Sequence, residues 1–176
     1  MRRASHHEFF PDRYARRLEG AKDIREIFQV VKDAVMDTEG WSRSGLTLGF
    51  AELGGSEGSL IGALHPLGTN LILLGHVPLR KVKESYTDLC KPYLFVVLMH
   101  EYVHTIGIVE QVDTRDRVLA IARTLFGEHH LVTKLAEDIK TYLPFVTYPT
   151  DLWLPEGTVI EPVEGFGNSS NDATKG

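Results

Sequence analysis

Residues 91–107 read Lys-Pro-Tyr-Leu-Phe-Val-Val-Leu-Met-His-Glu-Tyr-Val-His-Thr-Ile-Gly, and they form the most hydrophobic helical stretch that the sequence predicts. Polar side chains interrupt the apolar run only at His100, Glu101, His104 and Thr105. A helix that is hydrophobic on nearly all sides is a buried helix. We therefore predict that residues 91–107 form an internal helix on which the other elements pack.

Two histidines of this helix are placed to bind one metal ion. His100 and His104 are four residues apart, so their side chains lie about 40° apart around the helix axis, one turn above the other. Glu101 is displaced by about 100° and can lie beside the ion without being a ligand. This His-Glu-x-x-His arrangement is typical of zinc hydrolases. We predict one catalytic Zn²⁺ ion, bound by His100 and His104, with Glu101 as the catalytic residue.

The residues after the second histidine extend the pattern. Residues 100–110 read His-Glu-x-x-His-x-x-Gly-x-x-Glu, which ends on Gly107 and Glu110. This spacing resembles that of the metzincin metallopeptidases, in which the helix breaks at the glycine and the third zinc ligand follows three residues later. The resemblance implies a small zincin-like metallopeptidase domain. Glu110 stands where metzincins usually carry histidine, and no methionine follows the motif.

Such a zinc site needs a third protein ligand and an open position for water. The resemblance places the third ligand at Glu110, and Gly107 would let the backbone turn sharply enough for Glu110 to reach the ion. Two alternatives stay open. Glu128 would suit the zincins whose third ligand is a glutamate on a later helix, and His129 or His130 would suit those with a distant third histidine.

The resemblance implies a zinc metallopeptidase that hydrolyses peptide bonds in a peptide or protein substrate. Glu101 would accept a proton from the metal-bound water as general base and pass it to the leaving nitrogen. In zincins the strand before the motif helix is an edge strand that binds extended peptides, a role that falls here to residues 69–74. Two other hypotheses are a zincin-fold metal-binding protein with a binding or regulatory role and no peptidase activity, and a structural domain with a chance motif. The polar candidates for stabilising an oxyanion are His65, Tyr102, His129 and His130.

Bulk composition argues against several other classes of protein. The chain has 176 residues, of which 43% are hydrophobic and 24% are charged, as is ordinary for one globular domain. A formal net charge of -5 argues against binding to nucleic acid through phosphate contacts. No apolar run reaches the ~18 residues that cross a bilayer, and the single cysteine, Cys90, leaves no intramolecular disulfide. We expect a soluble, cytoplasmic protein that does not bind a membrane.

The rest of the chain predicts a mixed α/β (α+β) fold. We expect a short, mostly mixed sheet that packs on an N-terminal helix and on the buried motif helix, followed by further C-terminal helices. Hydrophobic periodicity predicts the flanking helices at residues 9–38, 113–126 and 130–143. Alternating apolar residues and turn signals predict strands at residues 45–53, 60–64 and 69–74.

Domain boundaries follow from composition. We predict a flexible N-terminus at residues 1–8 and one zincin-like metallopeptidase domain at residues 9–163. Residues 164–176 are small and polar, which predicts a disordered tail.

Overall fold

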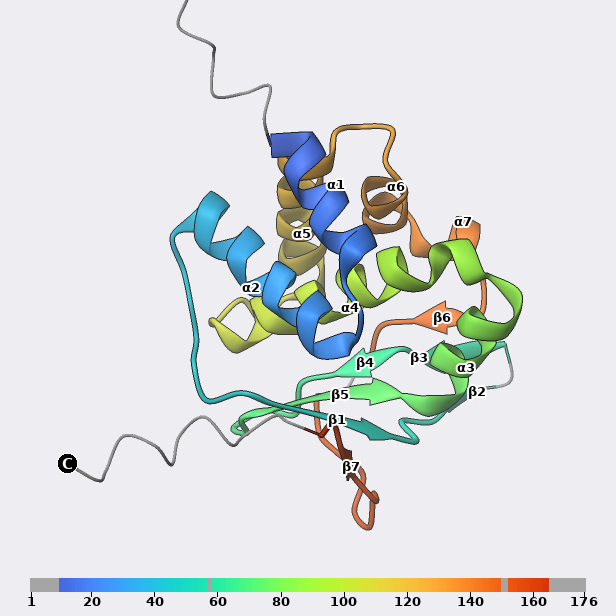
Figure 1. Cartoon of the computed structure of the whole chain (residues 1–176). Coiled ribbons are helices and arrows are strands. Elements are labelled where there is room, and N and C mark those ends of the chain that lie inside the picture. Colours follow the sequence, from blue (N-terminus) through green and yellow to red (C-terminus); the bar gives the residue numbers. More distant parts are fainter. Residues whose placement is uncertain (1–9, 57, 150–151, 165–176) are drawn as a thin grey trace, which may run out of the picture.

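The computed structural model describes residues 10–56, 58–149 and 152–164, which form a mixed α/β fold. This confirms the predicted fold class. The predicted flexible N-terminus, and the predicted disordered tail apart from residue 164, lie outside the described residues. Helices gather on one side of a small sheet, and helix α4 (Cys90–Thr105) runs between the other helices and the sheet (Figure 1).

Helix α4 contains the motif and is the most deeply buried element. Every residue from Pro92 to Thr105 is buried, which confirms the prediction of an internal helix. Gly107 follows with a φ of 106°, a conformation that L side chains rarely adopt. The glycine therefore allows the sharp turn that ends the helix. Among the described residues, no helix, α4 included, has the length and hydrophobicity that crossing a membrane requires.

The N-terminal helical region is divided in two, which corrects the single helix predicted for residues 9–38. Helix α1 spans Phe10–Gly20 and α2 spans Ile24–Glu39. The division lies at Asp23, whose carboxylate accepts a hydrogen bond from the N–H of Glu26 at 2.9 Å. The Glu26 carboxylate in turn accepts from the N–H of Lys22 at 2.6 Å. This reciprocal cap starts a new helix at Ile24.

The C-terminal helices differ from the prediction in their limits. Helix α5 spans Gln111–Phe126 and begins two residues earlier than expected. The helix predicted for residues 130–143 is divided into α6 (Leu131–Glu137) and α7 (Ile139–Tyr142). Asp138 separates them because its side chain accepts a hydrogen bond from the N–H of Lys140 at 3.1 Å and caps α7. Helices α2, α5 and α6 all pack against α4.

The main sheet has the strand order β4-β5-β1-β7. The interior strands β1 (Thr47–Ala51) and β5 (Leu71–Gly75) are parallel, and the edge strands β4 (Ala63–Leu64) and β7 (Glu161–Pro162) pair antiparallel with them. The prediction that residues 69–74 form the edge strand is therefore wrong, because β5 has a neighbour on each side. The edge strand that packs next to α4 is β4.

A second, smaller sheet lies beside the first and has the order β2-β3-β6. Strand β3 pairs antiparallel with β2 and parallel with β6. The strand predicted for residues 60–64 is thus divided at Gly62 between the two sheets. The remaining elements are β2 (Gly55–Ser56), β3 (Ser59–Ile61), β6 (Val146–Thr147), α3 (His76–Ser85) and the 3-10 turn η2 (Thr87–Leu89).

The two faces of the main sheet are covered differently. Ile72 and Leu74 of β5 belong to the large core that the sheet shares with the helices. Leu73 points to the opposite face, where side chains of the C-terminal segment at residues 152–160 pack on it. The end of the described chain therefore closes the outer face of the sheet and leaves α4 enclosed on the inner face.

Candidate metal centre

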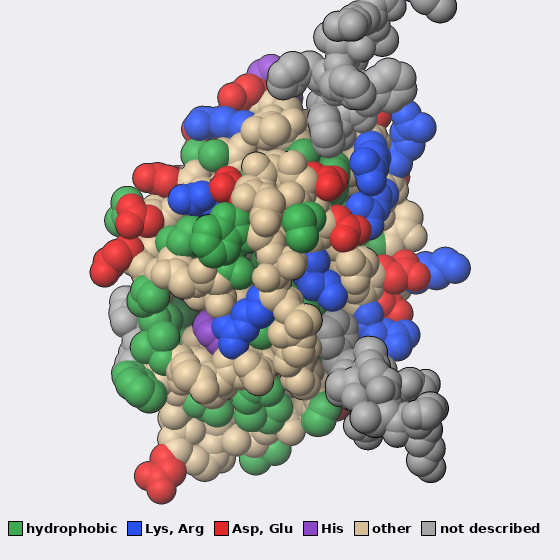
Figure 2. Space-filling model, turned by 90° about the vertical axis from the view of Figure 1, so that its left-hand side faces the viewer, with side chains coloured by type: hydrophobic (Ala, Val, Ile, Leu, Met, Phe, Trp, Pro, Cys, Tyr) green, Lys and Arg blue, Asp and Glu red, His purple; other side chains and the backbone are tan. Residues whose placement is uncertain are grey.

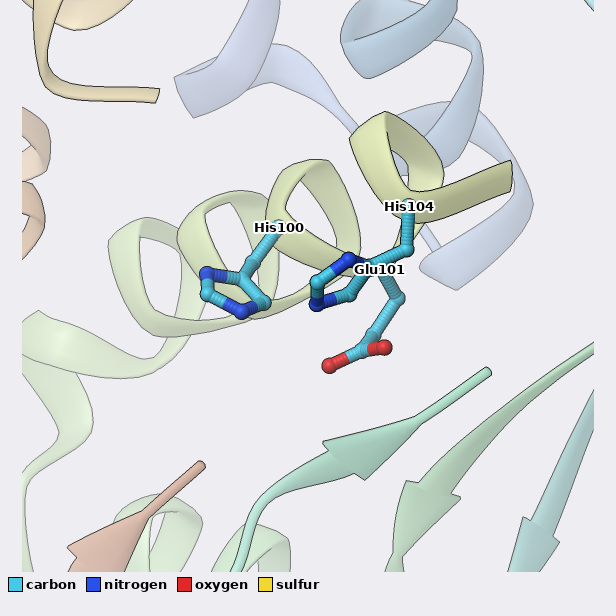
Figure 3. A group of neighbouring side chains, drawn as sticks. All are labelled: His100, Glu101 and His104. Atoms are coloured by element: carbon cyan, nitrogen blue, oxygen red, sulfur yellow. The ribbon is translucent and has the colours of Figure 1, made fainter. Parts of the chain in front are cut away.

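The structure brings His100, Glu101 and His104 together, and we call them the His-Glu-His group. Their possible ligand atoms lie within 4.8 Å of one another. Figure 3 shows both imidazoles and the carboxylate turned toward one space beside α4. His100 and Glu101 are fully buried and His104 is 6% exposed. Helical spacing produces this convergence, because residues four apart lie on the same face of a helix.

The His-Glu-His group carries most of the unsatisfied polar atoms in the described part of the chain. Four buried side-chain atoms there lack a hydrogen-bond partner, and three of them are His100 Nδ1, Glu101 Oε1 and His104 Nε2. A buried polar atom without a partner costs about 1–3 kcal/mol. A cation that binds lone pairs of this group would offset such a cost. The residues present therefore fit a bound metal ion.

His104 is held in the tautomer that metal binding requires. Its Nδ1–H donates a hydrogen bond to the carbonyl oxygen of Ile108 at 2.6 Å, so Nε2 keeps its lone pair. Ile108 reaches this position because the chain turns at Gly107. Burial lowers the pKa of His104, which keeps the imidazole neutral at pH 7.

Two side chains from other elements hold His100. Its Nε2 lies 2.7 Å from Oε1 of Gln111, the first residue of α5. The ring of Tyr148 stacks on the imidazole with the ring centroids 3.9 Å apart. Burial, and then the charge of His104, lower the pKa of His100 to about 3. The imidazole is therefore neutral and fixed in place at pH 7.

Glu101 combines deep burial with a single anchoring contact. Its Oε2 accepts a hydrogen bond from the backbone N–H of His65 at 2.9 Å, and Oε1 has no partner. Burial raises the pKa of Glu101 to about 8, although the contact with His65 opposes the rise. Without a cation nearby, the carboxyl group holds a proton at pH 7. A positive charge in the shared space would favour the ionised form.

The predicted third ligands do not join the His-Glu-His group. Glu110 is exposed and is the N-terminal cap residue of α5, where its side chain makes no capping hydrogen bond. Glu128, His129 and His130 lie beyond the other end of α5, which is about 24 Å long for its 16 residues. The side chains there have other partners: Glu128 pairs with Arg123 at 3.2 Å, and His130 Nδ1 caps α6.

The predicted oxyanion stabilisers differ in whether they contact the His-Glu-His group. His65 is buried beside Glu101, and its Nδ1–H donates to the carbonyl oxygen of Leu71 at 2.7 Å. The hydroxyl of Tyr102 accepts a hydrogen bond from the backbone N–H of Arg43 at 2.9 Å. Of the four candidates, only His65 therefore contacts the His-Glu-His group through a hydrogen bond that the structure defines.

Sequence reasoning missed Gln111 and Tyr148. Histidines and carboxylates are the usual zinc ligands beside cysteine, and Gln111, directly after Glu110, is neither. The sequence feature that could have indicated Gln111 is its position at the start of the helix that follows the turn at Gly107. Tyr148 has no local signal, because its position depends on the pairing of β6 with β3, which are far apart in the sequence.

The segment at Thr147 and Tyr148 covers the His-Glu-His group on the side of His100. The N–H of Gly62 donates to the carbonyl oxygen of Thr147 at 3.3 Å, and the next residue, Tyr148, lies on His100. The face that carries α2 and the turn between α4 and α5 shows hydrophobic side chains together with a few basic ones (Figure 2). Trp41, on the loop after α2, and Val109, in that turn, are exposed there.

Comparisons of the chain with protein-family models, with curated proteins and with solved structures found no match. The resemblance to zincins therefore rests on the sequence motif alone. Any statement about activity has to come from the chemistry of these side chains.

Proposed function

We propose that the protein is a zinc metallopeptidase in which His100 and His104 bind the ion and Glu101 is the general base. One observation carries the proposal: the three side chains of a His-Glu-x-x-His motif face one space, where Glu101 Oε1 and His104 Nε2 are buried without partners. Two imidazoles beside a carboxylate are a usual setting for zinc in hydrolases. When bound, zinc would polarise the substrate carbonyl and make its bound water acidic.

Glu101 would hold and move the proton. Its Oε2 is anchored by the N–H of His65, which leaves Oε1 free to face the shared space. A carboxylate fixed through one oxygen can accept a proton from the attacking water on the other and deliver it to the leaving nitrogen. Burial keeps the pKa of Glu101 high, which suits a group that first accepts and then donates a proton near pH 7.

The edge strand β4 supports a peptide or protein as substrate. It packs next to α4, and the residue directly after it, His65, contacts Glu101. Edge strands bind extended peptides through main-chain hydrogen bonds. Tyr148 and Pro149 lie over the group, so a peptide would have to displace this segment to reach Glu101.

That covering segment also favours the alternative function, a metal-binding protein with a binding or regulatory role. A site whose ligands are buried under Tyr148 can retain an ion without admitting a substrate. The two functions share His100 and His104 and differ in whether Glu101 acts on a substrate. The expected cytoplasmic location stays a prediction in both cases.

Peptide cleavage distinguishes the two functions. Zinc-loaded wild type and the variants Glu101→Gln and Glu128→Gln would be compared on a mixture of fluorogenic peptides, with the zinc content of each preparation measured. We expect Glu101→Gln to lose about 10²–10⁴-fold in rate while it retains zinc, and Glu128→Gln to match wild type. Equal cleavage by wild type and Glu101→Gln would show that the assigned base is wrong. No cleavage by zinc-loaded wild type would favour the metal-binding alternative.

A further inference from the structure

The turn between α4 and α5 places one further oxygen at the imidazole of His100. Gln111 Oε1 lies 2.7 Å from His100 Nε2. The imidazole of His104 lies edge-on to that of His100, with the ring centroids 4.8 Å apart, and its Nδ1 is engaged by Ile108. The Gln111 oxygen therefore lies at the first of two adjacent imidazoles, and Nε2 of the second has no partner.

The orientation of the Gln111 amide is fixed by its second contact. Its Nε2 donates a hydrogen bond to the carbonyl oxygen of Pro149 at 2.8 Å. A carbonyl oxygen only accepts hydrogen bonds, so the nitrogen end of the amide has to face Pro149. The oxygen end then faces the imidazole of His100. His100 and Pro149, which contact opposite ends of the amide, thus hold Gln111 Oε1 beside the His-Glu-His group, where it can act as a metal ligand.

We propose that Gln111 supplies the third protein ligand of the metal ion through Oε1, with His100 Nε2 and His104 Nε2 as the other two. This inference rests on the metal centre of the proposed function. Ligand atoms about 2.1 Å from a tetrahedral zinc ion lie about 3.4 Å apart. The 2.7 Å separation of Gln111 Oε1 and His100 Nε2 would therefore widen by less than about 1 Å. The proton on His100 Nε2 can move to Nδ1, which has no partner.

This assignment changes the chemistry expected of the site. Two imidazoles and an amide are all neutral, so the ligands offset none of the charge of a divalent ion. A carboxylate ligand such as the predicted Glu110 would have offset part of it. We expect the neutral set to bind zinc less tightly than a carboxylate set and to leave the ion a stronger Lewis acid.

The affinity for zinc tests the assignment of Gln111 as a ligand, with its neighbour Glu110 as the matched control. Zinc dissociation constants would be measured by competition with a chromophoric chelator for wild type, Gln111→Ala, Gln111→Glu and Glu110→Ala, with circular dichroism to verify folding. We expect Gln111→Ala to weaken binding more than about tenfold. The isosteric Gln111→Glu should bind zinc more tightly than wild type, because it adds a charge at the same position. Glu110→Ala should stay within about twofold of wild type.

A crystal structure of the zinc-loaded wild type gives the decisive result. The anomalous signal of zinc should place the ion within about 2.2 Å of Gln111 Oε1. An ion bound to His100 and His104 with Gln111 Oε1 more than about 3 Å away would overturn the assignment and leave the proposed metal centre standing. Wild type that takes up no zinc would instead overturn the metal centre itself, and the role of Gln111 with it.

Discussion

Two regions of the molecule carry the same types of residue, and only one of them has the features of a metal centre. The first is the His-Glu-His group, and the second is the Glu-His-His group formed by Glu128, His129 and His130 between α5 and α6. In the first, the side chains are buried and each of the three has a polar atom that lacks a partner. In the second, Glu128 pairs with Arg123 and His130 accepts a hydrogen bond from the N–H of Val132. Burial without partners, and not composition, therefore identifies the candidate site.

The largest expected difference between the two groups is in zinc affinity after one histidine is removed from each. His104→Ala deletes one of two imidazole ligands, so we expect the affinity for zinc to fall at least about 100-fold. His129→Ala removes an exposed histidine from the Glu-His-His group and should leave the affinity unchanged. Calorimetric titration of the metal-free proteins with zinc measures both affinities. If His129→Ala bound zinc more weakly than His104→Ala, the assignment of the metal centre to the His-Glu-His group would be contradicted.

The pH dependence of stability offers a second contrast, between a buried and an exposed carboxyl group. In the metal-free protein, burial raises the pKa of Glu101 from 4.5 to about 8. Its contribution to stability is therefore present below pH 4.5 and is lost as the pH rises to about 8. His100 acts in the opposite sense, because its pKa falls from 6.5 to about 3. Between pH 6.5 and 8 the loss due to Glu101 is unopposed by His100.

Chemical denaturation at several pH values can detect this loss. We expect metal-free wild type to lose about 2 kcal/mol of unfolding free energy between pH 6.5 and 8. Glu101→Gln cannot ionise and should not show the loss, whereas Glu110→Gln, at an exposed carboxylate, should behave as wild type does. A Glu101→Gln variant with the same pH dependence as wild type would mean that Glu101 is not the group responsible.

The covering ring gives the third contrast. Tyr148 stacks on His100, whereas Tyr142 on α7 packs at the edge of the core. Tyr148→Ala would expose His100, so we expect an excess of chelator to remove zinc about ten times faster than from wild type. Tyr142→Ala should leave that rate unchanged. Stopped-flow absorbance of a metal-sensitive dye measures the release, and equal rates for wild type and Tyr148→Ala would show that the ring does not limit access.

The smallest effect is expected in the Glu-His-His group. His130 Nδ1 caps α6 by accepting from the N–H of Val132 at 3.1 Å. His130→Ala should therefore cost about 1 kcal/mol of unfolding free energy and leave zinc affinity unchanged. Thermal unfolding and zinc titration of the same variant test both parts. A loss of zinc binding in this variant would support the distant-histidine ligand that the structure places beyond the far end of α5.

The sequence predicted the parts of the site that depend on local spacing. His100, Glu101 and His104 share one helix, so a 3.6-residue repeat was enough to bring them together, and their apolar surroundings were enough to predict burial. The break after α4 was equally local, because Gly107 allows it. The division between α1 and α2 could also have been read from Asp23 and Glu26, whose spacing is that of a reciprocal cap.

The parts that were missed depend on contacts between distant segments. The strand at residues 69–74 was expected at an edge, but β4, which is the end of the strand predicted at residues 60–64, pairs with it. Which strands pair cannot be predicted from the pattern of either strand alone. Tyr148 reaches His100 only because β6 pairs with β3. Gln111 lies close to the motif in the sequence, yet only the turn geometry and the contact with Pro149 show that its oxygen faces His100.

Zinc stoichiometry tests the central claim most directly. Purified protein would be loaded with excess zinc, passed through a desalting column to remove free ion, and analysed for zinc and protein by mass spectrometry and amino-acid analysis. If the His-Glu-His group is a metal centre, wild type should retain one zinc ion per chain, and the paired variant His100→Ala/His104→Ala should retain none. Less than about half an equivalent in well-folded wild type would contradict the claim.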